Sequence, residues 1–562
     1  MFNLYFISQS TCSILLLLNF ALKNVACNPV VRTKSGCLKG SIDRNIDGGK
    51  FYQFMGIPYA EPPVGDLRFK APKPKHPWKG IRNATEEGSA CPHRREKRFN
   101  QSVPLVGDED CLFLNVYTAE LPRNSATMKL KPVLVYIHGG GYVFGNGGRA
   151  KYGPKNLMTE DIVLVTLNYR LGILGYLSFS DPTLEIPGNA GLKDQRLALR
   201  WVQDNIRRFG GDPNRVTIDG ESAGGSSVHF HVISPSCRGL FHGAIIQSGS
   251  TLNSWPWGKL DGAISVVNKI GVKAKTQKEA LDVLKSLSAY ELVRVLEQMG
   301  ITECSNDWQD ISPVIEYPHE GAFLTKSPID ILNAGEQNQV PLILGYNSKE
   351  GHWMNYQQMA AKAMGTWVAP FSWECIIPWQ TGIKKGTAKS KRFADTLERT
   401  YQTETPEENV VNAWSDSIYD VGIEQAIKFH LKTHLAPIYA YRISVITRLN
   451  YLKRSLNLWD KPGVFHSDEL GYLFSQSITP KVSPGSPEDI YRRRIVKLWT
   501  NFVKYKNPTP DDELNVLWQP VESVDPIKQL DIGENLTFVD TPEARRFVVW
   551  NELLEESPFI IN

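Results

Sequence analysis

One ten-residue stretch carries the clearest chemical signal in the sequence. Val216–Gly225 reads Val-Thr-Ile-Asp-Gly-Glu-Ser-Ala-Gly-Gly, so β-forming residues run into a Gly-x-Ser-x-Gly motif and small residues follow. This order predicts a strand, a sharp turn and a helix, with Ser222 exposed at the helix N-terminus. Glycines allow the tight turn, and the helix dipole favours negative charge that develops at the serine. The pattern makes Ser222 the candidate nucleophile, and an ordinary Gly/Ser loop is the alternative interpretation.

A glycine-rich loop upstream supplies groups that such a nucleophile needs. The residues His-Gly-Gly-Gly follow directly on an apolar run that ends at Ile137. Glycines let the backbone approach a substrate closely, and their N–H groups can stabilise an oxyanion. We therefore expect Gly140 and Gly141 to donate hydrogen bonds to the oxyanion, with the N–H of Ala223 as the third donor.

An acid and a base for the serine come from later in the chain. Glu350 follows the apolar run Pro341–Leu344, and His466 lies in Gly-Val-Phe-His-Ser-Asp-Glu-Leu. An acid can orient a histidine and stabilise its charged form, and the histidine can take the proton of the serine. The order Ser, Glu, His along the chain is one that hydrolases built on a sheet of this kind use. The competing histidines are His352, His430 and His434.

Alternating strands and helices are the elements that must position these residues. Continuous apolar runs predict buried strands at Lys131–Ile137, Ile162–Leu167, Val216–Ile218, Ala244–Ile246, Val340–Leu344 and Ile438–Ile443. A helix is predicted over Gly191–Phe209, and another begins at Ala223. This alternation predicts an α/β fold with a mostly parallel sheet covered on both faces. Chemistry on such a sheet lies at the carboxyl ends of its strands. Residues 255–335 and 352–435 read as helical insertions over that edge.

Composition and charge exclude several classes of function. Of 562 residues, 42% are hydrophobic and 22% charged, and the net charge is +4 with Lys and Arg scattered. We therefore expect neither a nucleic-acid partner nor a membrane surface, but a small-molecule substrate. No Cys/His cluster has metal-ligand spacing, so neither a metal nor another cofactor is expected. Nothing in the sequence indicates the oligomeric state.

The N-terminal 27 residues resemble a secretory signal peptide. Ser13–Leu22 is an apolar core and Val25-Ala26-Cys27 resembles a cleavage site, although no Lys or Arg precedes the core. An uncleaved anchor is the alternative, but the apolar run is short for a membrane span. We expect a secreted protein with a single domain over residues 28–562. The sequons at Asn83, Asn100 and Asn535 fit glycosylation of a secreted surface.

Six cysteines remain after the predicted signal peptide. Cys91 and Cys111 bracket a polar, basic loop, and a disulfide that closes this loop is one interpretation. Spacing alone leaves the other four free or paired, and these are Cys37, Cys237, Cys304 and Cys375.

Several blocks resemble the type-B carboxylesterase/lipase (cholinesterase-like) family. The blocks are Phe209–Gly224, Glu109–Val116, Gly56–Pro63, Arg68-Phe69 and Gly191–Gln195. The sequence as a whole is most similar to secreted insect carboxylesterases. The resemblance implies the α/β-hydrolase fold and ester hydrolysis through an acyl-enzyme. The implied site residues are Ser222, Glu350 and His466 with the oxyanion donors Gly140, Gly141 and Ala223. It also implies a Cys91–Cys111 disulfide and the ion pairs Arg68–Glu109 and Arg170–Asp194.

Departures from the family pattern narrow the expected substrate. The loop between Cys91 and Cys111 has no Trp, which disfavours a choline-ester specialist. Glu221 stands where juvenile hormone esterases usually carry Gln, and the acid Asp219 is unexplained. Trp255 is the predicted acyl-pocket residue, and core packing is an equal alternative for Trp257.

We expect a secreted serine esterase. A juvenile hormone or pheromone esterase is the alternative, a lipase is a further rival, and a non-catalytic adhesion-type relative is disfavoured by the intact triad.

Overall fold

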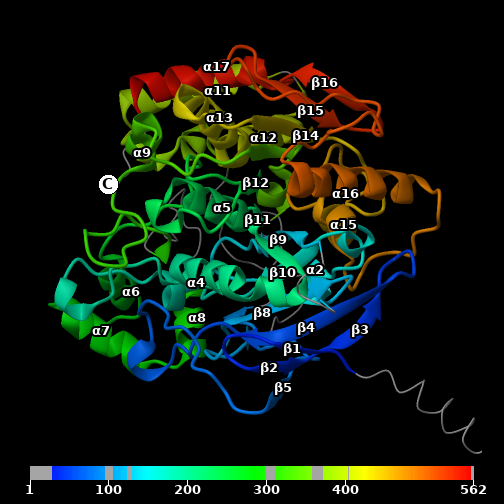
Figure 1. Cartoon of the computed structure of the whole chain (residues 1–562). Coiled ribbons are helices and arrows are strands. Elements are labelled where there is room, and N and C mark those ends of the chain that lie inside the picture. Colours follow the sequence, from blue (N-terminus) through cyan, green and yellow to red (C-terminus); the bar gives the residue numbers. More distant parts are fainter. Residues whose placement is uncertain are drawn as a thin grey trace, which may run out of the picture.

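An 11-stranded mixed sheet runs through the centre of the molecule (Figure 1). The computed structural model describes residues 28–94, 105–122, 129–298, 311–356, 371–402 and 404–558. The strand order is β16-β15-β14-β13-β12-β11-β9-β10-β8-β4-β3. The bounds are β3 Ser41–Arg44, β4 Lys50–Pro58, β8 Phe113–Thr118, β9 Lys131–Ile137, β10 Val163–Leu167, β11 Gly211–Glu221, β12 Gly243–Gln247, β13 Leu342–Asn347, β14 Ile438–Ile443, β15 Lys528–Ile532 and β16 Leu536–Asp540. The prediction of an α/β-hydrolase fold is confirmed.

The strands from β10 through β9, β11, β12, β13 and β14 to β15 pair in parallel, and the outer strands pair antiparallel. The register sets Asp219 beside Tyr136 of β9, and Glu221 beside Gln247 of β12. A small separate sheet joins β1 (Val30–Arg32), β2 (Cys37–Lys39) and β5 (Ile81–Asn83). All predicted strands form, and β11 is longer than Val216–Ile218 because it begins before a bulge at Gly211/Val216.

Helices cover both faces of the central sheet, as its apolar strands require. On one face α4 (Ala190–Asn205), α5 (Ala223–Ile233) and α13 (Val421–Thr433) pack against alternate strand residues in one apolar core. On the other face α15 (Leu470–Leu473) and α16 (Pro487–Tyr505) pack against the intervening residues in a second core. The predicted helix Gly191–Phe209 ends early, because Ile206–Phe209 tightens into a 3-10 turn before Gly210, which has φ 83°.

The remaining helices lie in the insertions and near the C-terminus. Their bounds are α2 Arg149–Tyr152, α3 Gly172–Tyr176, α6 Gly262–Lys269, α7 Gln277–Ser286, α8 Ala289–Gln298, α9 Pro328–Ala334, α11 Ala388–Thr400, α12 Pro406–Ser415, α14 Tyr451–Leu456 and α17 Ala544–Glu556. A π-helical turn, η9 (Asp416–Asp420), joins α12 to α13. The helical character expected for 255–335 and 352–435 is present where these segments are described. Among all described helices, none is long and apolar enough to cross a membrane.

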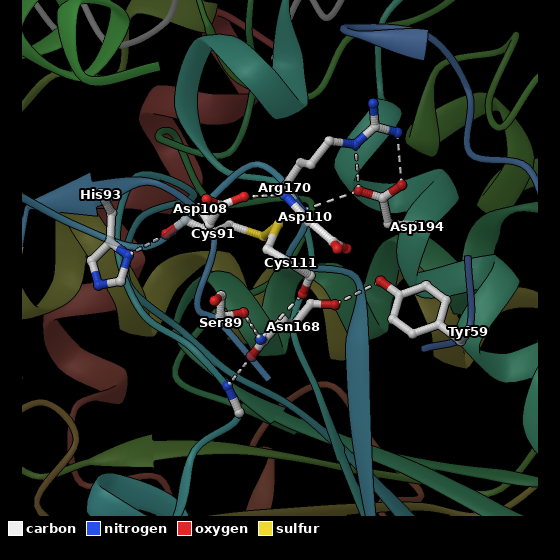
Figure 2. The surroundings of a disulfide bond; sticks show 11 residues. Tyr59, Ser89, Cys91, His93, Asp108, Asp110, Cys111, Asn168, Arg170 and Asp194 are labelled. Atoms are coloured by element: carbon white, nitrogen blue, oxygen red, sulfur yellow. Dashed lines mark hydrogen bonds and ion pairs between the residues drawn. A yellow bond between two sulfur atoms is a disulfide. The ribbon is translucent and has the colours of Figure 1, made fainter. Parts of the chain in front are cut away.

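A disulfide joins Cys91 to Cys111, as the resemblance implied (Figure 2). Asn168 braces this loop, since its Nδ2 donates to the carbonyl oxygens of Ser89 and Cys111. The buried ion pair Arg170–Asp194, with 2.7 Å between Nη2 and Oδ1, lies close by.

The other implied ion pair also forms, with 2.8 Å between Arg68 Nη2 and Glu109 Oε1. Cys37 and Cys237 are free, whereas Cys375 is disulfide-bonded and Cys304 lies outside the described residues.

Candidate active site

Ser222 sits at the turn between β11 and α5. Its φ of 60° and ψ of −123° are strained for a residue with a side chain. A Cβ on Gly224 would lie 2.1 Å from the carbonyl oxygen of Ile137, and a Cβ on Gly220 would lie 2.5 Å from the backbone of Gly224. Only glycines fit this turn, which presents Ser222 at the start of a helix, where the dipole favours negative charge.

The glycine loop after β9 lies beside the same turn. Gly140 and Gly141 have φ values of 116° and 59°, and a Cβ on Gly140 would lie 2.0 Å from the carbonyl oxygen of Phe144. A Cβ on Gly139 would lie 3.1 Å from Cβ of Ser222, so the loop and the nucleophile turn are in contact. Within the described residues, no protein group accepts a hydrogen bond from the N–H of Gly140 or Gly141. These donors are free to bind an oxyanion.

Glu350 and His466 meet at the same edge of the sheet. His466 Nδ1 lies 2.7 Å from Glu350 Oε2, and both side chains are buried. Glu350 Oε1 accepts hydrogen bonds from the backbone N–H of Asn347 at 2.7 Å and from Ser248 Oγ at 2.5 Å. These bonds fix the carboxylate, and the carboxylate in turn fixes one edge of the imidazole.

The other ring nitrogen of His466 lies close to Glu221. His466 Nε2 lies 3.2 Å from Glu221 Oε1, which also accepts a hydrogen bond from Ser467 Oγ at 2.5 Å. Among the described residues, no hydrogen bond joins His466 to Ser222.

Two carboxylates decide the charge state of His466. Burial lowers the pKa of His466, but the charges of Glu221 and Glu350 outweigh it and raise the pKa above the ordinary histidine value. The two carboxylates therefore stabilise the protonated form of His466. The adjacency of Glu221 to Ser222 was visible in the sequence, but its contact with His466 was not predicted.

A stacked aromatic ring covers one face of His466, and no feature of the sequence predicts this contact. Tyr419 of η9 packs on the imidazole with 4.3 Å between ring centroids and 28° between ring planes.

Asp219 is buried on the α16 side of β11. Its Oδ1 accepts a hydrogen bond from Gln247 Nε2 at 2.7 Å, and its Oδ2 has no partner among the described residues. Burial raises the pKa of Asp219 to about 7. Glu469, buried at the start of α15, also has a raised pKa, because of burial and the nearby charges of Glu221 and Glu350. We call Asp219, Glu221, Glu350 and Glu469 the carboxylate cluster.

The two tryptophans singled out in the sequence differ in setting. Trp255 is half-buried, lies near Tyr142 with 6.3 Å between ring centroids, and donates its Nε1–H to the carbonyl oxygen of Ile418. Trp257 is fully buried and packs edge-on against Phe230, so core packing explains it.

The competing histidines have other surroundings. His352 packs against Phe465, and burial lowers its pKa to about 4. His430 Nε2 lies 2.9 Å from His229 Nε2, and the His434 ring lies edge-on to His430. We call His229, His430 and His434 the imidazole cluster.

The remaining predicted site residues are the sequons. Asn83 and Asn535 are exposed, whereas Asn100 lies outside the described residues, as does the predicted signal peptide. Among the described residues no group of His, Cys, Asp and Glu side chains could hold a metal ion.

Known proteins are similar to this chain over nearly its whole length. The model of the Carboxylesterase family matches residues 27–550. Esterase E4 of Myzus persicae is 33% identical, with 94% of this chain and 97% of the relative covered. Juvenile hormone esterase of Tribolium castaneum is 32% identical, with 90% and 88% covered. The crystal structure of juvenile hormone esterase from Manduca sexta, with OTFP covalently attached, matches with a TM-score of 0.80 and 27% identity over 94% of this chain and 100% of that chain.

Proposed function

Because this chain belongs to the carboxylesterase family and is a carboxylic ester hydrolase, we propose that it is a secreted serine esterase that works through an acyl-enzyme on Ser222. The observation that carries the proposal is the meeting of Glu350 and His466, 2.7 Å apart, at the sheet edge where the strained turn presents Ser222.

In this mechanism Ser222 attacks the ester carbonyl while His466 takes its proton. The oxyanion that forms is held by the N–H groups of Gly140, Gly141 and Ala223, and each such donor contributes about 3 kcal/mol to lowering the barrier. His466 then protonates the leaving alcohol, and water releases the acid by the reverse sequence. Glu350 keeps Nδ1 of the imidazole protonated and oriented.

In this mechanism Glu221 is a second carboxylate that acts on His466. Its Oε1 lies 3.2 Å from His466 Nε2, so its charge stabilises the imidazolium after proton transfer. The ring then moves between Glu221 and Ser222 as the proton is taken and delivered. Trp255, half-buried on the loop after β12, is the proposed wall of the acyl pocket.

Secretion is the second part of the proposal. It is supported by the apolar N-terminal run and by the exposed sequons at Asn83 and Asn535. Expression of the full chain in a eukaryotic secretory system should place the esterase in the medium, with a mass that lacks about the first 27 residues and that falls after glycosidase treatment. Retention of the full-length chain on membranes would contradict it.

Turnover of a short-chain chromogenic ester tests the catalytic proposal. Ser222→Ala should abolish the burst of acyl-enzyme and reduce kcat by at least about 10⁴-fold. Ser236→Ala, on the turn after α5, is the matched control and should keep wild-type turnover. Retained turnover in Ser222→Ala would refute the assignment, and a wild-type protein without turnover would favour the adhesion-type alternative.

Similarity to juvenile hormone esterases favours one substrate alternative, a juvenile hormone specialist. A comparison of kcat/KM across methyl esters of long terpenoid acids and short-chain esters separates this specialist from a general carboxylesterase.

A further inference from the structure

We propose that the π-helical turn η9 positions the imidazole of His466, and that Tyr419 is a positioning residue that confines the ring to one plane. This inference rests on the proposed function, because it takes His466 as the base for Ser222. Its starting point is the stack of Tyr419 on His466, with 4.3 Å between ring centroids and 28° between planes.

The imidazole needs such confinement. Glu350 holds only Nδ1, and the opposite nitrogen, Nε2, must reach Glu221 and Ser222 at different steps. The ring is attached through its Cβ–Cγ bond and hydrogen-bonded at Nδ1, and rotation about Cβ–Cγ would tilt it and carry Nε2 away from both partners. An aromatic ring packed face to face blocks tilting but leaves movement within the ring plane free. Tyr419 supplies that face.

The turn that carries Tyr419 is built to be rigid. A π-helical turn closes an i→i+5 bond, here from the N–H of Val421 to the carbonyl oxygen of Asp416, and π-turns are frequent at functional sites. The carboxylate of Asp416 accepts hydrogen bonds from the guanidinium of Arg546 at 2.7 and 2.9 Å and from Tyr401 Oη at 2.5 Å. The first residue of the turn is therefore fixed by a buried, charged anchor.

The loop after β12 holds the other side of the turn. Asn253 Nδ2 donates to the carbonyl oxygens of Ile418 and Tyr419, each at 2.8 Å, and Trp255 Nε1 donates to that of Ile418 at 2.9 Å. A Cβ on Gly422, just after the turn, would lie 2.2 Å from Asn253 Nδ2, so this contact is close. The proposed acyl-pocket residue Trp255 is thereby tied to the turn that faces the base.

The helical segment formed by α12 and η9 also contacts the loop that carries Glu350. Gly351, next to Glu350, donates its backbone N–H to Ser415 Oγ at 2.9 Å, and a Cβ on Gly351 would lie 2.1 Å from the carbonyl oxygen of Val411. One segment thus contacts the base directly, the acid through its neighbour and the acyl pocket through Trp255.

Removal of the stacked ring should be visible in the kinetics. Tyr419→Leu should lower kcat by roughly 10- to 100-fold while KM changes by less than about threefold, because binding is kept and the base is misplaced. Tyr419→Phe keeps the ring and should recover most of kcat. Tyr439→Leu, which removes a buried tyrosine of β14 that packs on Phe502 and Trp518 and not on His466, is the control for a general loss of structure.

The pH profile provides a readout that a purely structural role would not move. The charges that act on His466 are Glu350 after β13, Glu221 on β11 and Lys151 on α2, and they are unchanged in the Tyr419 variants. An aromatic face stabilises a cation, so its loss should lower the pKa of His466 and move the acid limb of kcat/KM to lower pH. Tyr419→Phe and Tyr439→Leu should leave the limb in place.

Two outcomes would overturn the inference. It is overturned if Tyr419→Leu has wild-type kcat and pH profile, or if Tyr419→Phe is as impaired as Tyr419→Leu. Should Tyr419→Leu fail to fold, Tyr419→Met, closer in volume, takes its place, with the rate of inactivation by an organophosphate as an independent measure of proton transfer from Ser222. Failure of the proposed function is distinct, since it appears as retained turnover in Ser222→Ala.

Discussion

His466 and His430 are both buried side chains, but their neighbours differ in charge. His466 lies among the carboxylate cluster, between Glu350 and Glu221, and its pKa is raised. His430 lies in the imidazole cluster, where burial and the neighbouring His229 and His434 hold its pKa well below the ordinary value. Burial alone favours the neutral imidazole in both regions. The neighbouring carboxylates therefore make His466, and not His430, the better proton acceptor.

The largest expected contrast is in turnover. His466→Gln should reduce kcat by about 10³- to 10⁴-fold, because the proton of Ser222 then has no acceptor. His430→Gln should stay within about threefold of wild type, because His430 contacts other imidazoles and not the site. Steady-state ester hydrolysis measures both. An equal loss in the two variants would remove the distinction between the regions.

A stability effect at high pH is the next largest. The pKa of Asp219 is about 7 when folded and ordinary when unfolded, so the stabilisation from its protonated form is lost as pH rises from about 4 through 7. A shift of that size corresponds to on the order of 4 kcal/mol above pH 8. Asp219→Asn keeps the acceptor for Gln247 but does not titrate. The free energy of unfolding of this variant should therefore fall less than that of the wild type as pH rises. Urea unfolding from pH 5 to 9 checks it, and parallel curves for the two proteins would contradict it.

The imidazole cluster should respond to pH in the opposite direction. The pKa of His229 is lowered to about 3 by burial, so its contribution to stability is present above about pH 6.5 and is lost as pH falls. The loss amounts to about 2 kcal/mol between pH 7 and pH 5. The Gln side chain of His229→Gln can still accept a hydrogen bond from Thr251 and donate one to His430. Its free energy of unfolding should therefore fall by about 2 kcal/mol less than that of the wild type between pH 7 and pH 5. Unfolding curves at the two pH values measure this, with His76→Gln at the surface as the control.

The smallest expected effect concerns the acid limb of activity. Glu221 raises the pKa of His466, so Glu221→Gln should lower that pKa and move the acid limb of kcat/KM to lower pH. The same change at Glu522, an exposed residue, should leave the limb unchanged. A limb that stays in place in Glu221→Gln would show that Glu350 alone sets the charge of the base.

The sequence predicts the strands and loops that carry the site residues better than it predicts the side chains that pack around them. Ser222 and the glycine loop follow apolar strands, and parallel strands bring their carboxyl ends to one edge, so their convergence follows from local pattern and sheet geometry. Glu350 and His466 follow from chain order and from the family resemblance. The structure brings these residues together, while their catalytic roles remain predictions.

The contacts around the site depend on packing between distant segments. The partner of Asp219, Gln247, becomes visible only when β11 and β12 are paired in register. Tyr419 reaches His466 because a helix changes its hydrogen-bond pattern for one turn, and no residue in Asp416–Asp420 signals that change. The rival His430 could not be dismissed from the sequence, because the sign of its pKa shift depends on neighbours from two other segments.

Organophosphate labelling followed by mass spectrometry tests the central claim most directly. We predict one adduct per chain on the peptide that contains Ser222, formed in proportion to the loss of ester turnover. Labelling should be much slower in His466→Gln and should keep its wild-type rate in His430→Gln. An adduct on another residue, or full inhibition without an adduct on Ser222, would contradict the account.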